Sequence, residues 1–165
     1  MVGEGPERGR LKAMCLDRKL DNVTFGTSPY EEMDELYSIA FASIATLRNI
    51  EVAKAMRLSK IFPSLSCGVP VIYSGFGEAA DLIRATKCGM VVEPENPRLL
   101  AEAIQTLASR PEMRSDLGRS GRTLVEREYS WSAIVQRWLT SMGITTSTDV
   151  DDARIGREVK ELALQ

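Results

Sequence analysis

The stretch GVPVIYSGFGE, residues 68–78, predicts a buried strand that leads through a turn into a helix. Val69–Tyr73 is a short apolar run, Ser74–Glu78 is rich in glycine, and Ala79–Thr86 has the apolar spacing of a helix. Short apolar runs bounded by glycine or proline are typical of strands that are covered on both faces, as in parallel sheets. This stretch therefore favours an α/β fold.

Strands and helices alternate on both sides of this stretch. The expected strands are residues 1–2, 23–25, 42–47 and 90–92, and the expected helices are residues 7–20, 28–40, 59–67, one that starts at 96–97, 111–129 and 130–142. Such alternation predicts βαβ units and a mostly parallel, Rossmann-like sheet with helices on both faces. Because the first strand is represented only by Met1 and Val2, we expect the domain to be truncated on its N-terminal side.

We expect two segments in the domain organisation. Residues 1–142 form the Rossmann-like domain, and residues 143–165 form a linker rich in Thr, Ser and Asp followed by a helix at Ala153–Leu164.

Composition excludes several classes of function. The chain has 165 residues and a formal charge of −2, without the basic excess of a dedicated nucleic-acid binder. It has no histidine, which excludes His-based triads and metal sites that need imidazole. The three widely spaced cysteines indicate buried, reduced thiols, and no apolar run has the length of a membrane span. We interpret the chain as cytoplasmic, with no metal and no cofactor.

Three turns near expected strand ends are candidate binding sites, because ligands of open α/β sheets bind beyond the carboxyl ends of the strands. Gly3-Glu4-Gly5-Pro6 and Ser74–Glu78 would admit a ligand close to the backbone. The Ser59-Lys60 pair, just after Arg57, would place a hydroxyl and an ammonium at a helix start that suits phosphate. Each turn also has a purely structural interpretation, as a tight turn or a helix cap.

Taken in order, these pieces resemble the C-terminal, donor-binding domain of group 1 glycosyltransferases, the retaining GT-B type with two Rossmann-like domains. The matching motifs are residues 2–7 (VGEGPE), 20–26 (LDNVTFG), 59–62 (SKIF), 68–72 (GVPVI), 75–78 (GFGE), 88–92 (CGMVV) with Pro94, and 129–131 (YSW). The resemblance covers residues 1–142 and is greatest to the subgroup that makes bacterial surface polysaccharides.

The resemblance implies a nucleotide-diphosphate-sugar donor, used without a metal or a separate cofactor, and transfer to a hydroxyl of a sugar-bearing acceptor held by another domain. It implies that Gly26 lies near the base and Arg57–Lys60 near the diphosphate, with Lys60 stabilising the leaving group. The expected donor-binding residues are Gly3, Gly5, Gly26, Arg57, Ser59, Lys60, Gly75, Gly77 and Glu78.

Two positions depart from the family pattern. The glutamate that usually bonds the ribose hydroxyls is replaced by Pro63, and the position eight residues earlier, often another glutamate, is Ala55. Pro63 is also expected to move the start of the helix toward Phe62. Because the acceptor domain is missing, we expect the chain alone to be inactive.

Three alternatives stay open. The first is a sugar-nucleotide epimerase of the same architecture, the second a non-catalytic nucleotide-binding or interaction module, and the third a split-gene fragment. A homodimer is a further expectation, through the unpaired strand edge near Val2 and Phe25 and with the helix at Ala153–Leu164 covering apolar surface on the partner. As part of a larger enzyme the domain would lie at the inner face of the membrane.

Overall fold

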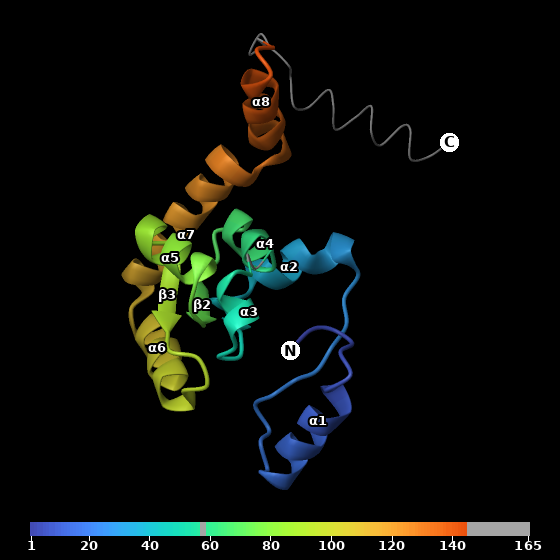
Figure 1. Cartoon of the computed structure of the whole chain (residues 1–165). Coiled ribbons are helices and arrows are strands. Elements are labelled where there is room, and N and C mark those ends of the chain that lie inside the picture. The colour runs from blue at the N-terminus through green and yellow to red at the C-terminus, as the bar shows by residue number, and fades with distance from the viewer. Residues whose placement is uncertain (57–58, 145–165) are drawn as a thin grey trace, which may run out of the picture. The chain divides into compact units, whose positions relative to one another are not determined.

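Figure 1 shows a computed structural model of the chain, which describes residues 1–56 and 59–144. The chain divides into two compact units, which begin at Met1 and Phe41 and are described here one at a time. Arg57 and the expected C-terminal helix at Ala153–Leu164 lie outside the described residues.

The first unit, Met1–Ala40, contains helix α1 (Arg8–Asp17), the 3₁₀ turn η1 (Tyr30–Glu32) and helix α2 (Met33–Ser38). The strand expected at 23–25 is not formed. A single parallel bridge joins Val2 to Gly26 instead. Helix α1 ends at Asp17, before the expected residue 20, and Lys19 just beyond its end takes a positive φ of 53°.

The second unit is built on a three-stranded parallel sheet in the order β1-β2-β3, which confirms the predicted α/β class. The strands are β1 (Ser43–Thr46), β2 (Val71–Ser74) and β3 (Gly89–Val92). All four residues of the central strand β2 are buried, as its apolar sequence predicts.

Helices cover both faces of this sheet. On one face, α4 (Ile61–Ser66) and α5 (Glu78–Thr86) pack against Val71 and Tyr73. On the other face, α6 (Pro97–Ser109) and α7 (Pro111–Leu124) pack against Ile72. The alternation of these three side chains along β2 is the period of a strand that is covered on both faces.

Three residues mark the ends of helices in the structure. Asn96 caps α6, since its side-chain oxygen accepts a bond of 3.1 Å from the Leu99 N–H. Ser130 caps α8 (Trp131–Ser141) through a bond of 3.2 Å from the Ala133 N–H. Gly68 ends α4 with a φ of +73°, a conformation that glycine adopts without strain.

Three local features differ from expectation. The predicted loop after β1 contains a short helix, α3 (Glu51–Lys54). The predicted helix 111–129 becomes α-helix only to Leu124 and continues as the π-helix η2 (Val125–Tyr129). Cys88 is buried as expected, whereas Cys67 is exposed because it lies at the end of α4.

Helix α8 buries none of its residues completely. Its two tryptophans, Trp131 and Trp138, are 82% and 60% exposed, so neither is a core residue of this unit. Among the described residues no helix is long and apolar enough to span a bilayer.

Candidate functional site

The carboxyl ends of the three strands are tied together at one edge of the sheet. The Leu47 N–H donates to the Ser74 carbonyl at 2.9 Å, which joins the end of β1 to that of β2. The Gly75 N–H donates to the Val92 carbonyl at 3.2 Å, and the Ser74 hydroxyl donates to the Glu93 carbonyl at 3.3 Å. These bonds fix the turn after β2 between its neighbours, at the edge where ligands of such sheets bind.

The first glycine of this turn accommodates an aromatic ring. A Cβ on Gly75 would come within 2.7 Å of the Tyr73 ring. The Tyr73 hydroxyl donates to the Phe76 carbonyl at 3.4 Å, and burial raises the pKa of the phenol. The sequence predicted that glycine here admits a ligand, but at Gly75 the neighbour is the chain's own side chain.

The second glycine of the turn accommodates the end of α3. A Cβ on Gly77 would overlap the Lys54 carbonyl, and the φ of Gly77 is +83°. The β2–α5 turn and the segment after β1 therefore pack directly against each other. Glu78 follows as the first residue of α5 and supplies negative charge to its N-terminal turn, together with Asp81.

Ser59 and Lys60 lie exposed at the start of α4. The helix begins at Ile61, with Lys60 in the N-cap position, so the predicted late start is confirmed. The Phe62 N–H donates to the Ser59 carbonyl at 3.2 Å, and Pro63 has no N–H. Anion binding here would depend more on the Ser59 and Lys60 side chains than on backbone donors.

An open cavity of about 330 Å³ adjoins this edge on the side of α6. Arg48 and Glu95 line it, with their Nε and Oε1 atoms 3.9 Å apart, and both side chains are exposed, so their attraction is weak. The site residues expected from sequence did not include this pair. Glu95 adopts a positive φ of 59°, which is uncommon for a residue other than glycine and could not be predicted from the sequence.

The other predicted site residues belong to the first unit. Gly3 and Gly26 are joined by a bond of 3.0 Å from the Gly3 N–H to the Gly26 carbonyl, and the Gly5 carbonyl accepts from the Arg8 N–H at 3.0 Å. A Cβ at any of these glycines would meet nothing within 4 Å. Unlike Gly75 and Gly77, they leave space beside the backbone.

The structure thus collects the predicted residues into two groups. Gly3, Gly5 and Gly26 form one group in the first unit, and Ser59, Lys60, Gly75, Gly77 and Glu78 lie in the second. Arg57 is outside the described residues. Within the described ranges no three His, Cys, Asp or Glu side chains are grouped as metal ligands.

Comparison with known proteins finds several similar proteins. A GDP-mannose-dependent monoacylated alpha-(1-6)-phosphatidylinositol monomannoside mannosyltransferase from Corynebacterium glutamicum is 29% identical over 143 residues, which is 83% of this chain and 36% of that protein. Sucrose-phosphate synthase from Thermosynechococcus elongatus superposes with a TM-score of 0.67 at 27% identity, over 86% of this chain and 36% of that one.

A glycosyltransferase from Rickettsia africae shares the fold, with a TM-score of 0.70 at 22% identity, over 85% of this chain and 38% of that one. The chain therefore spans little more than a third of the length of these relatives. The family described as glycosyl transferases group 1 matches residues 1–124, three quarters of the sequence, and the chain belongs to this family.

Proposed function

We propose that the chain is the part of a glycosyltransferase that binds a nucleotide-diphosphate-sugar donor. The family match carries this proposal, because residues 1–124 include the turn at Gly26, the Ser59-Lys60 pair and the turn at Gly75–Gly77. The last two border the carboxyl edge of the parallel sheet, which is where such folds bind nucleotides.

In this proposal Lys60 stabilises the departing diphosphate. Lys60 is exposed in the N-cap position of α4 and directly follows the exposed Ser59. Positive charge aimed at a developing negative charge lowers the barrier to its departure. The sugar then passes with retention of configuration to an acceptor hydroxyl on a polysaccharide or glycoconjugate. The acceptor is held by a second domain, so the chain alone binds the donor without transferring the sugar.

Titration of the full chain with GDP, UDP and ADP, followed by amide NMR, tests the donor site. GDP is the first choice, because the corynebacterial relative is named for GDP-mannose. We expect weak, saturable shifts at Ser59, Lys60 and Gly77, with affinity in the high micromolar range or weaker. Guanosine is the control without phosphates. An absence of shifts at these amides with every nucleotide at millimolar concentration contradicts the assignment.

Pro63 favours a second candidate, a non-catalytic nucleotide-binding module. The residue lies in the first turn of α4 and has neither a carboxylate nor an N–H to offer a ribose. Adding an acceptor domain from a group 1 relative distinguishes the two candidates. Acceptor-dependent release of nucleoside diphosphate from a donor sugar supports the enzyme, and binding without release supports the module.

We further propose that two copies associate through the free edge of β1. Among the described residues β1 pairs only with β2, and Ile44 on β1 is 50% exposed. The strand has no charged residue and no proline, which are the usual devices that keep an edge from pairing. Antiparallel pairing of two β1 strands about a twofold axis would satisfy the free backbone groups of both.

A further inference from the structure

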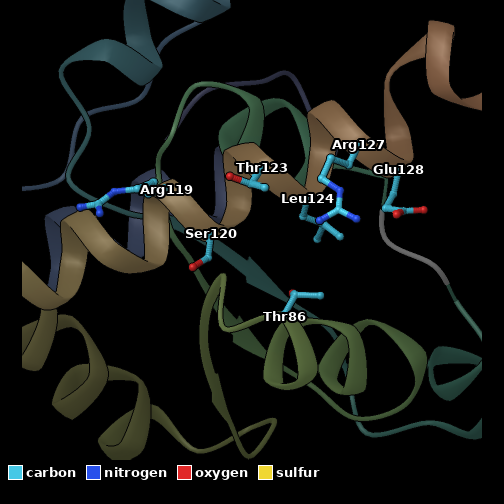
Figure 2. A pocket seen from close by; sticks show the side chains of 7 residues that line it. All are labelled: Thr86, Arg119, Ser120, Thr123, Leu124, Arg127 and Glu128. Carbon is cyan, nitrogen blue, oxygen red and sulfur yellow. The ribbon is translucent and has the colours of Figure 1, made fainter.

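A second recess lies at the other end of α5 from the candidate donor site. It opens between the last residue of α5 and the helices α7 and η2, with a volume of about 420 Å³ (Figure 2). Its lining residues are Thr86, Arg119, Ser120, Thr123, Leu124, Arg127 and Glu128. Since α5 starts at the Gly77 turn and ends at Thr86, this recess is separate from the carboxyl edge of the sheet.

Most charges around the recess are neutralised within the fold. Arg119 pairs with Asp116 at 3.1 Å, and the Glu128 carboxylate accepts from Arg137 at 2.9 Å. Arg127, in contrast, has no ion pair and no hydrogen bond to any described residue. Arg127 therefore leaves one uncompensated positive charge at the recess.

Figure 2 separates the two arginines of the recess. The Arg127 side chain extends from η2 over Leu124, on the side that faces Thr86, whereas Arg119 points away from both. Only Arg127 is therefore placed to contact a molecule held between α7 and α5. The π-helical turn that carries Arg127 is a rare feature, which is found frequently at functional sites.

Two hydroxyl groups of the recess have hydrogen atoms to donate. Helical Ser and Thr usually bond back to their own helix, as Thr106 does to the Glu102 carbonyl at 2.7 Å. Thr86 does the same to Leu82 at 2.7 Å. Ser120 and Thr123 make no such bond to any described residue, so their hydroxyls are available.

The C-terminus of α5, which also borders the recess, would repel an anion only weakly. Carbonyl groups at the C-terminus of a helix repel anions. Two of them are already bonded, since the Lys87 N–H donates to the Arg84 carbonyl at 3.4 Å and the Cys88 N–H to the Ile83 carbonyl at 3.3 Å.

We propose that this recess binds a phosphate monoester. Arg127 holds the phosphoryl group by charge-assisted hydrogen bonds, Ser120 and Thr123 donate to it, and Leu124 contacts the organic part. The volume suits a small phosphorylated molecule rather than a bare ion. The site is independent of the proposed donor site, because no residue is shared between them.

Amide NMR of the full chain with glucose-6-phosphate as the probe tests the proposal, with glucose and inorganic phosphate for comparison. We expect saturable shifts at Ser120, Thr123 and Arg127, stronger binding of glucose-6-phosphate than of phosphate, and no shifts with glucose. Arg127→Gln weakens binding about tenfold, which is the usual size of one lost charge-assisted bond. Arg119→Gln is the matched control and changes affinity by less than about twofold.

Vesicles of phosphatidylcholine with and without phosphatidic acid identify the source of the phosphate. Sedimentation only with phosphatidic acid vesicles, lost in Arg127→Gln, assigns the same site to a lipid headgroup. Equal losses for Arg127→Gln and Arg119→Gln overturn the proposal, because they indicate diffuse charge. The same conclusion follows if neither probe produces a shift or sedimentation. Urea unfolding shows that each variant is folded. The double variant Ser120→Ala, Thr123→Val removes the two hydroxyl donors while keeping Arg127, and it tests the site a second time.

Discussion

The Lys54 carbonyl oxygen occupies the place into which a β-carbon on Gly77 would project. Gly77 has φ +83° and ψ −159°, a region of backbone space that is essentially restricted to glycine. The end of α3 is therefore held against the turn after β2 by contact between two backbones. Because Gly77 has no side chain, the end of α3 can pack directly against the turn of the candidate site.

We predict that Gly77→Ala lowers the free energy of unfolding by at least about 3 kcal/mol, since it combines backbone strain with a steric overlap. Gly68→Ala is the control, because Gly68 also has a positive φ of +73° but open space beside it. We expect about 1–2 kcal/mol for this strain alone. Urea denaturation measures both losses of unfolding free energy. Equal losses would show that the steric overlap with the Lys54 carbonyl adds nothing to the backbone strain.

The fold of the second unit could be predicted because its signals are local. The apolar run Val69–Tyr73 lies between Gly68 and the glycine-rich turn Ser74–Glu78, and Asn96 and Ser130 cap the helices that follow them. The strand at 23–25 could not be predicted correctly, since a strand depends on its partner and only Val2 pairs there, with Gly26.

The site residues stay a prediction, because glycine in a turn has two causes that a sequence does not separate. Gly75 and Gly77 make room for Tyr73 and Lys54, whereas Gly3 has open space beside it. The cavity lined by Arg48 and Glu95 arises from two loops that are far apart in sequence, so no sequence motif predicts it.

We predict that stability falls at alkaline pH through Tyr73. Burial raises the pKa of its phenol in the folded state, so the folded chain holds this proton more tightly than the unfolded chain does. The stabilisation is complete below the unfolded pKa of about 10 and is lost as pH rises toward the folded value. Tyr73→Phe should reduce this alkaline loss in urea titrations. An unchanged pH profile in Tyr73→Phe would contradict the prediction.

Lys60→Ala should weaken the binding of GDP more than that of guanosine. The ammonium acts on the phosphates, and one charge-assisted bond corresponds to about tenfold or more in affinity. Lys87→Ala, at the far end of α5, is the matched control and should leave GDP binding unchanged. Calorimetry or amide NMR measures the affinities. Equal GDP affinity of Lys60→Ala and the unchanged chain removes Lys60 from the site.

Self-association through β1 should appear as a rise in mass with concentration in light scattering. Ile44→Lys places a charge on the free edge and should keep the chain monomeric. Trp138→Gln is the control for the other exposed apolar surface, on α8. A strictly monomeric mass of the unchanged chain at high concentration excludes the edge pairing, and a loss of association in Trp138→Gln alone assigns it to α8.

Pro63→Glu should strengthen nucleotide binding by restoring the carboxylate that relatives of this type are expected to direct at the ribose. The position is in the first turn of the six-residue helix α4, where a carboxylate is favoured by the helix dipole and an added N–H is harmless. One hydrogen bond to a charged group predicts about tenfold tighter GDP binding.

Binding of inorganic diphosphate should not change, because it has no ribose. Pro111→Glu, at the start of α7, is the matched control. If Pro63→Glu binds GDP no better than Pro111→Glu does, the ribose does not reach the start of α4, and this prediction is wrong.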